Sequence, residues 1–365
     1  MPRINEEINE EWISDKTRYA CDGLKNQRLD SPYMKKNTKF EKISWKEAYN
    51  KIFEKISETP SEKIAALTGD MTNMETMFAL KEFFEKTIRS ENLDSRVDNL
   101  YVNTSDRENY LLNSSIEGIE DSDLIILIGA NPRFEATMLN SRIRKAYLNN
   151  NTDIFCLGDI GDLNYPYEVL DNSTKTIKDI VNHTHRISEK IHNSKKPIFL
   201  IGQSALKLKS SPFLFEELKK YLIKNNKIND NWNALNILSN DASTVGSNYL
   251  NIFSSNNGSN KTIDKISNNQ IDVLFLFGQE NLKINKKNEF IIYVGSHGDK
   301  GANLADIILP GAAYTEQDGY FANIEGKIQK AYKASYPPGE AKEDWEIVNE
   351  LACLLYTSPS PRDSF

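Results

Sequence analysis

Glycines, carboxylates and aromatic residues concentrate in residues 296–329, which read SHGDKGANLADIILPGAAYTEQDGYFANIEGKIQ. The short apolar run 305–309 stops at Pro310 and Gly311, which predicts the end of a buried strand. The polar loop that follows mixes aromatic residues with glycines, and such a loop usually has one defined conformation against a ligand or a partner. Its candidate pocket residues are Glu316, Gly319, Asn323, Glu325 and Gly326.

A second candidate is the turn IGANPR, residues 128–133, between a predicted strand and a predicted helix. In an open α/β sheet, ligands bind outside the carboxyl ends of the strands. Gly129 allows a ligand close to the backbone, Asn131 offers a donor and an acceptor, and Arg133 could pair with a phosphate. A plain strand–helix connection with proline in its first turn explains the same residues, so both interpretations stay open.

Sequence motifs of several enzyme classes are absent. The chain contains no G-x-G-x-x-G fingerprint, no phosphate-binding P-loop and no G-x-S-x-G nucleophile elbow. Cys21, Cys156 and Cys353 lie far apart and form no C-x-x-C pair, so no zinc or iron–sulfur framework is predicted. His183 and His185 lie two positions apart, on different sides of a helix, and are expected to be surface residues. We therefore predict no catalytic residue and no metal ligand in this chain.

Six short apolar runs, each ending in glycine, are the elements that must position these residues. They cover residues 64–69, 124–129, 154–158, 198–202, 273–278 and 291–295. Such runs are typical of strands that are buried on both faces of a parallel sheet. Their number indicates two sheets.

Helical patterns lie between the apolar runs. Met77, Leu80 and Phe84 follow at helical spacing behind Asn73, a candidate N-cap residue. Similar patterns cover residues 139–147, 215–222 and 345–355. Strands that alternate with helices predict a layered α/β fold. The asparagine- and serine-rich residues 254–261 are expected to form a surface loop.

Composition narrows the function classes. The net charge of −7 and the lack of a basic, aromatic-rich stripe argue against nucleic acid as a partner. The longest apolar runs fall far short of the about 20 residues that a membrane-spanning helix needs, so no membrane span is predicted. The acidic N-terminus MPRINEEINEEW has no apolar core and is not expected to act as a targeting signal.

Three segments together resemble one family. They are residues 2–33, residues 127–148 and the block 296–329. In this combination and order they are similar to the large iron–sulfur subunit of respiratory NADH:quinone oxidoreductase, complex I, and the resemblance covers residues 2–355. The first segment is specific to that subunit, whereas the other two also resemble molybdopterin oxidoreductases.

The resemblance implies an α/β fold of two Rossmann-like lobes with mostly parallel sheets, as in molybdopterin oxidoreductases. The second lobe is expected to interrupt the first. The implied parts are a tail of a preceding iron–sulfur module at 1–40, a first lobe at 41–120 plus 290–355, an inserted second lobe at 121–289, and a non-native tail at 356–365.

The resemblance also carries expectations about cofactors. Clusters of the 4Fe-4S and 2Fe-2S types are expected upstream of this chain, and no cofactor within it. Active molybdopterin enzymes ligate their metal through Cys, selenocysteine, Ser or Asp in the stretch that matches residues 94–118, which here holds no cysteine. Ser105 and Asp106 are the remaining ligand candidates there. The candidate residues in the turn and in the block 296–329 are therefore expected to outline a vestigial pocket.

The implied function is part of complex I, which transfers electrons from NADH to quinone. This chain would act mainly as a scaffold of the peripheral arm and would contact other peripheral-arm subunits. Its expected location is the matrix side of the mitochondrial inner membrane or the cytoplasmic face of a bacterial inner membrane. The alternative is a fragment of an active molybdopterin oxidoreductase such as a formate dehydrogenase.

Overall fold

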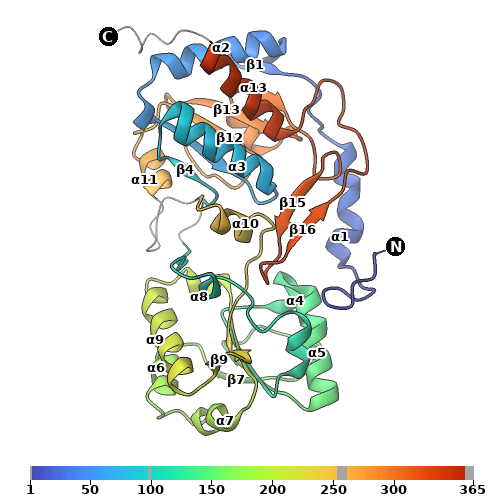
Figure 1. The fold of residues 1–365 in the computed structure, drawn as a ribbon, viewed down its shortest axis with the longest axis vertical. Helices are drawn as coiled ribbons and strands as arrows, with labels where there is room; N and C mark the ends of the chain where they lie inside the picture. The colour runs from blue at the N-terminus through green and yellow to red at the C-terminus, as the bar shows by residue number, and fades with distance from the viewer. Residues whose placement is uncertain (1, 98–99, 253–260, 358–365) are drawn as a thin grey trace.

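Two lobes lie one beyond the other along the long axis of the protein, and each contains a β-sheet covered by helices (Figure 1). The computed structural model describes residues 2–97, 100–252 and 261–357. Strands and helices alternate along the chain, and packing helices on a sheet buries its apolar faces. The predicted α/β fold with two sheets is confirmed.

The first lobe is built on a seven-stranded sheet in the order β2-β1-β14-β13-β12-β3-β4. Its strands are β1 (Tyr33–Lys36), β2 (Lys39–Lys42), β3 (Ile64–Thr68), β4 (Leu93–Asp94), β12 (Val273–Phe277), β13 (Phe290–Gly295) and β14 (Ile307–Pro310). The strands from β14 to β4 run parallel, whereas β1 and β2 add an antiparallel edge.

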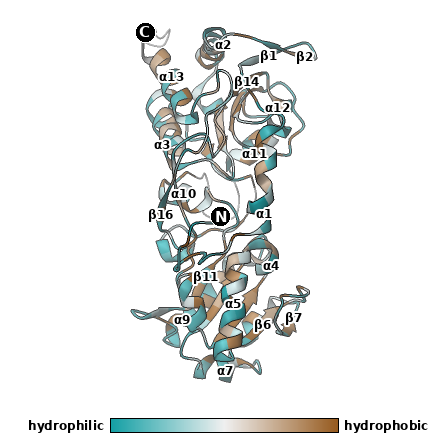
Figure 2. Cartoon of the chain, turned by 90° about the vertical axis from the view of Figure 1, so that its right-hand side faces the viewer, coloured by the Kyte–Doolittle hydropathy of each residue, from teal (hydrophilic) through white to brown (hydrophobic). Residues whose placement is uncertain are grey.

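Alternate residues of these strands face two separate apolar layers. Phe275 and Phe277 pack toward one set of helices, and Leu274 and Leu276 face the opposite side. The first set comprises α2 (Trp45–Glu58), α3 (Met74–Glu82), a π-helix (Phe83–Ile88) and α13 (Asp344–Thr357). The opposite side is covered by α11 (Lys261–Ser267) and α12 (Lys300–Leu304). Figure 2 shows the resulting pattern of hydrophobic strands inside and hydrophilic helix faces outside.

The second lobe contains a parallel five-stranded sheet in the order β11-β8-β5-β6-β7. Its strands are β5 (Leu124–Ile128), β6 (Asp153–Leu157), β7 (Glu168–Asp171), β8 (Pro197–Ile201) and β11 (Leu235–Ile237). Its helices are α4 (Pro132–Glu135), α5 (Thr137–Asn150), α6 (Lys175–Val181), α7 (Ser188–Asn193), α8 (Gln203–Leu206) and α9 (Ser211–Lys224). A small ribbon of β9 (Ile228–Asn229) and β10 (Trp232–Asn233) precedes β11.

All six predicted strands form, and the predicted helices form with them. They correspond to β3, β5, β6, β8, β12 and β13. Helix α3 begins after Asn73, whose side chain accepts a hydrogen bond from the backbone N–H of Thr76, so the predicted N-cap is confirmed. The loop predicted at 254–261 lies outside the described residues except for Lys261.

The expected lobe limits need corrections. The first lobe was expected to extend to residue 120, but Leu100, Leu112 and Ile119 pack in the cores of the second lobe. Two strands also belong to another part than expected. Strand β12 lies between β13 and β3 in the first sheet, although the inserted lobe was expected to continue to 289. Strand β1 pairs with β14, although residues 1–40 were expected to belong to a preceding module. For both strands, pairing with a strand distant in sequence decides to which lobe they belong. Local composition carries no information on such pairing. The tail expected at 356–365 lies outside the described residues apart from the end of α13.

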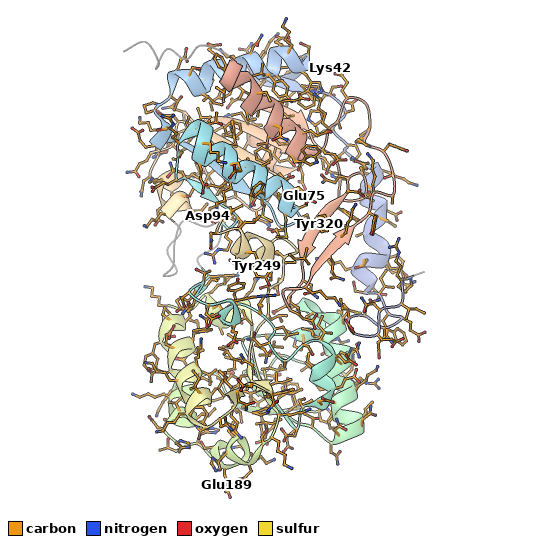
Figure 3. All side chains as sticks on the ribbon, in the orientation of Figure 1. Lys42, Glu75, Asp94, Glu189, Tyr249 and Tyr320 are labelled. Carbon is orange, nitrogen blue, oxygen red and sulfur yellow. The ribbon has the colours of Figure 1, made fainter. Side chains whose placement is uncertain are left out.

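Two further segments run between the lobes. Strands β15 (Gly319–Ala322) and β16 (Ile328–Ala331) form an antiparallel hairpin. Residues 2–30, which we call the strap, contain α1 (Asp15–Tyr19) and run along one side of both lobes (Figure 1). Helix α10 (Thr244–Tyr249) lies where the lobes meet, and Figure 3 places Tyr249 at this junction. Among the described residues, no helix is long and apolar enough to cross a membrane.

Candidate site between the two lobes

A cavity of about 260 Å³ lies between the lobes, at the carboxyl ends of strands from both sheets. Asp70 follows β3 and Asn281 follows β12, while Gln203 follows β8 and Ile237 ends β11. Ligands of open α/β sheets bind at this edge, because the loops that leave the strands converge there. The position therefore makes the cavity the leading candidate site.

The segment between β4 and β5 forms much of the wall. Its contributions include Ser95, Arg96, Tyr101, Asn103, Asn109 and Tyr110. This is the stretch that the resemblance matched to the metal-ligand position. Ser105 and Asp106 do not belong to the described lining. The Ser105 hydroxyl donates to Asn103 Oδ1 (2.7 Å), and Asp106 Oδ1 accepts from the Glu108 N–H (3.2 Å).

The charged groups of the lining do not form a basic site. Asp70 and Asp241 line the cavity together with one cationic residue, Arg96. The Arg96 guanidinium donates to the backbone carbonyl of Leu100 (3.2 Å), and Asp70 Oδ2 accepts from Asn281 Nδ2 (2.6 Å). Phosphate groups bind where several cations or backbone N–H groups converge. The described lining offers one arginine against two carboxylates.

The predicted turn after β5 lies outside this lining. Gly129 has a φ of 60°, and its carbonyl accepts from the Ser204 hydroxyl (2.6 Å), so α8 covers the backbone that a ligand would approach. Arg133 Nη1 binds both the side chain and the carbonyl of Asp162 (2.7 Å each). Asn131 Nδ2 donates to the carbonyl of Ile160 (3.0 Å). These contacts support the strand–helix connection rather than a phosphate site.

Three candidates of the block 296–329 meet at the tip of the β15–β16 hairpin. Asn323 Oδ1 accepts from the backbone N–H groups of Glu325 (3.0 Å) and Lys327 (2.9 Å). Glu325 Oε1 accepts from the N–H of Ile116 (2.6 Å), next to the second lobe. The carbonyl of Gly326 accepts from both Arg107 Nη2 and the Tyr249 hydroxyl (3.0 Å each). The hairpin tip therefore joins the lobes.

The other two candidates of the block lie in the first lobe. Glu316 is buried and forms a bidentate ion pair with Arg28 of the strap, in which Arg28 Nη1 lies 2.6 Å from Glu316 Oε1. A Cβ atom at Gly319 would lie 2.9 Å from the Asn73 side chain, so the glycine permits close packing of β15 on α3. Figure 3 shows Tyr320 beside Glu75 at the same contact.

None of the eight candidate residues belongs to the described lining of the cavity. Sequence reasoning missed Asp70, Asp241, Asn248 and Asn281. Asp70 and Asn281 shortly follow predicted strands, so the rule on carboxyl ends could have identified them. Asn248 carries no local signal, since helix α10 reaches the cavity through tertiary packing alone. No group of three His, Cys, Asp or Glu residues that could hold a metal occurs in the described part of the chain.

Comparison with known families identifies the fold. The family model described as molybdopterin oxidoreductase matches residues 28–353. The chain belongs to the molybdopterin oxidoreductase family. A second model, the 4Fe-4S domain of the NADH-ubiquinone oxidoreductase NDSU1/NuoG-like type, matches residues 1–22.

Curated relatives of this molybdopterin oxidoreductase family member confirm the resemblance to the complex I subunit. The chain is 40% identical, over its full length, to the "NADH-ubiquinone oxidoreductase 75 kDa subunit" of Reclinomonas americana, covering 54% of that protein. It is 42% identical over 97% of its length to a subunit of the NADH-quinone oxidoreductase of Rickettsia prowazekii, covering 51% of that protein. The mitochondrial 78 kDa subunit of Candida albicans is 38% identical, and the match covers 97% of this chain and 49% of that protein. The chain thus spans about half the length of these relatives.

Solved structures support the same fold. A chain of the formyltransferase/hydrolase complex of Methylorubrum extorquens matches with a TM-score of 0.63 at 11% identity, over 89% of this chain and 99% of that chain. The acetylene hydratase of Pelobacter acetylenicus matches with a TM-score of 0.58 at 12% identity, over 98% of this chain and 65% of that chain. These matches confirm the molybdopterin-oxidoreductase-like arrangement of the two lobes.

The cavity does not fit the cofactor for which the family is named. No cysteine belongs to its described lining, since Cys156 is buried in the second lobe and Cys21 and Cys353 are exposed. A soft metal centre favours thiolate ligands. The volume of about 260 Å³ is below the ~300–1,000 Å³ typical of ligand sites, and the carboxylates of Asp70 and Asp241 oppose phosphates. Size and charge therefore both disfavour a pterin nucleotide.

Proposed function

We propose that this chain is part of the large iron–sulfur subunit of NADH:quinone oxidoreductase and acts mainly as a scaffold of its peripheral arm. The observation that carries the proposal is 38–42% identity, over nearly the whole chain, to bacterial and mitochondrial subunits of that enzyme. The complete protein would then take part in electron transfer from NADH to quinone. Its 4Fe-4S and 2Fe-2S clusters would lie outside residues 28–353.

A scaffold needs its parts held at fixed positions, and the strap provides one such anchor on the second lobe. Arg142 of α5 has a side chain only 4% exposed, and it pairs with Glu120 (2.5 Å) and Glu10 (3.4 Å). Its second terminal nitrogen donates to the carbonyl of Glu6. Lys145 forms a further ion pair with Glu10. A buried arginine with several charged and carbonyl partners holds the strap more firmly than an exposed pair would.

The strap has a second anchor on the first lobe. The ion pair of Arg28 with the buried Glu316 is supported by a backbone hydrogen bond from the Leu29 N–H to the carbonyl of Ser296 (3.0 Å). His297 Nε2 lies 3.0 Å from the carbonyl of Gly23. Because residues 1–22 match a 4Fe-4S domain model, this double anchorage supports a role in holding the iron–sulfur module against both lobes.

The proposal extends to partners and location. Other peripheral-arm subunits would contact this chain. The chain would lie on the matrix side of the mitochondrial inner membrane, or on the cytoplasmic face of a bacterial inner membrane. Bacterial and mitochondrial names among the relatives support both settings. We propose no turnover and no resident cofactor within this chain, in line with the poor fit of its cavity to a pterin nucleotide.

Metal analysis of the full-length protein in its assembled complex tests the proposal. We expect iron in amounts that match several clusters, NADH oxidation with quinone reduction, and no stoichiometric molybdenum or tungsten. Stoichiometric molybdenum or tungsten would overturn the scaffold role. It would favour a fragment of an active molybdopterin oxidoreductase instead.

A further inference from the structure

An open apolar groove of about 610 Å³ lies on the first lobe, between helices α3 and α13. The two helices lie side by side (Figure 1). Phe78, Ala79 and Phe83 line the groove from α3 and the π-helix, and Trp345 and Ala352 line it from α13. Phe78 is 54% exposed although its side chain is large and apolar. A groove of this kind accepts a further helix, whose side chains enter between those of its two walls.

The sequence of α13 indicates that its outward side is covered by a partner. Residues 351–355 read LACLL, and five consecutive residues span the whole circumference of a helix. A helix that is apolar all round is buried, whereas a surface helix has a single apolar stripe. Of these five residues, Leu351 is buried, Cys353 is exposed and the other three are half-buried. This part of α13 therefore has the composition of an interface.

Aromatic side chains extend the same surface onto the β15–β16 hairpin. Tyr320 is 44% exposed, and its backbone N–H donates to the side chain of Glu75 (2.9 Å), which lines the groove. Tyrosine and tryptophan are enriched among the residues that carry the binding energy of protein interfaces. The hairpin and the groove thus form one surface, with Glu75 where they meet (Figure 3).

The charge of this surface defines its occupant further. Lys86 and Glu82 line the groove and pair with each other, whereas Glu75 forms no ion pair among the described residues. Glu346, which follows Trp345 on α13, also has no ion-pair partner in the described part of the chain. Opposite charges across an interface steer association and fix its register. The occupant therefore carries lysine or arginine beside its apolar residues.

A second copy of this chain fits the charge poorly. A two-fold contact places the same patch on both partners, so Glu75 and Glu346 of one copy would meet an equally acidic surface. Like charges brought together in this way disfavour the contact. A partner of different sequence is therefore favoured over self-association.

We propose that the groove between α3 and α13 binds an amphipathic helix of another peripheral-arm subunit. The apolar stripe of that helix contacts Phe78 and Trp345, and a lysine or arginine beside the stripe pairs with Glu75. The stripe has the spacing i, i+3, i+4 and i+7, because this spacing places side chains on one face of a helix. The inference rests on the proposed function and specifies where on the first lobe, and by what chemistry, a neighbouring subunit docks.

Site-specific photo-crosslinking in the purified, assembled enzyme tests the inference. The photoreactive residue p-benzoylphenylalanine replaces Phe78 in the full-length protein, and mass spectrometry identifies the residue to which it crosslinks. We expect a crosslink to a helix of another subunit that has the apolar spacing and a lysine or arginine within one turn of it. The matched control carries the same group in place of Phe213, which is 57% exposed on α9, and should give no crosslink to that helix.

The outcomes separate the inference from the proposed function. An assembled enzyme in which position 78 gives no crosslink would overturn the inference and leave the proposed function in place. A crosslink only within the same polypeptide, to a second copy of it or to a segment that is not helical would do the same. Absence of the protein from NADH:quinone oxidoreductase would overturn the proposed function and the inference with it.

Glu75→Gln tests the assigned charge, because it removes the negative charge and keeps an acceptor for the Tyr320 N–H. We expect the crosslink yield from position 78 to fall about threefold, the size typical of one exposed ion pair. The control is Glu189→Gln, an exposed position on α7 at the far end of the second lobe (Figure 3), which should leave the yield unchanged. An unchanged yield in Glu75→Gln would refute the pairing of Glu75 with a basic residue.

Discussion

Asp344 is a buried carboxylic acid at the start of α13, and its Oδ1 has no hydrogen-bond partner among the described residues. Burial, with a smaller contribution from Glu343, raises the pKa of Asp344 to about 7. Between its usual pKa and about pH 7, the folded chain holds a proton that the unfolded chain has released. The contribution of Asp344 to the free energy of unfolding therefore falls as pH rises through this window and is constant above it.

Asp344→Asn should remove this pH dependence. We expect the unfolding free energy of the variant, relative to wild type, to increase by roughly 4 kcal/mol between pH 4 and pH 8, at 1.36 kcal/mol for each unit of pKa shift. Urea unfolding at several pH values measures it. The control is Asp318→Asn, because this aspartate is exposed and its pKa is shifted in the opposite direction to that of Asp344. A hydrogen bond from the Lys333 N–H lowers the pKa of Asp318. Parallel pH profiles for wild type and Asp344→Asn would contradict the prediction.

Gly326 combines a left-handed backbone with close neighbours. Its φ is 80°, and a Cβ atom would overlap the Tyr249 hydroxyl and lie 2.6 Å from Arg107 Nη2. Gly161 has a nearly equal φ of 79° but no heavy atom within 4 Å of its Cβ position. The two glycines therefore separate backbone strain from steric contact.

Alanine at Gly161 and at Gly326 should lower the free energy of unfolding by different amounts. We expect Gly161→Ala to lower the unfolding free energy by about 1 kcal/mol through strain alone. Gly326→Ala should lower it by about 3 kcal/mol or more, because the hairpin tip must also move away from Tyr249 and Arg107. Denaturant unfolding of both variants gives the difference. Equal losses of unfolding free energy would show that the steric contacts at the hairpin tip add no cost to that of backbone strain.

At the scale of elements, the strap depends on Arg142 of α5. Arg142→Ala should release residues 5–10, because it removes the contacts to Glu10 and to the Glu6 carbonyl. We expect amide hydrogen exchange at Ile8 and Glu10 to accelerate at least tenfold, which is about 1.4 kcal/mol. The matched control is Arg144→Ala, an exposed arginine on the same helix. Unchanged amide exchange in Arg142→Ala would mean that the contacts of Arg142 do not hold the strap in place.

At the scale of the whole molecule, the strap and the hairpin should make the two lobes unfold together. Chains with two domains often unfold in separate steps, so coincident transitions are informative. Trp45 reports on the first lobe, where its indole donates to the carbonyl of Glu340 (3.1 Å). Trp232 reports on the second lobe through a bond to the carbonyl of Pro197 (2.8 Å).

Two variants that retain either Trp45 or Trp232 as the single tryptophan test this coupling. We expect their fluorescence transitions in urea to share one midpoint, and circular dichroism to follow the same curve. The control is each variant's native circular dichroism spectrum, which should match that of the wild type. Two resolved midpoints would show that the lobes are independent and that the strap and hairpin do not couple them.

The sequence alone determined the element types and the family. The six apolar runs became strands because strands buried on both faces leave a continuous local signal. Asn73 was recognisable as an N-cap because its side chain acts within one helical turn. The antiparallel strands β1 and β2 escaped prediction, since Lys35, Lys36, Lys39 and Lys42 leave no apolar pattern.

Only the tertiary structure decided which strands share a sheet and where a ligand could bind. Strand β12 joined the first lobe through pairing with β3, which is distant in sequence. The candidate residues Gly129 and Arg133 are engaged by Ser204 and Asp162, whereas Asn248 reaches the cavity from a short helix. The physical reason is the same in each case. Local patterns report burial, but the identity of the burying partner depends on contacts between segments that are far apart along the chain.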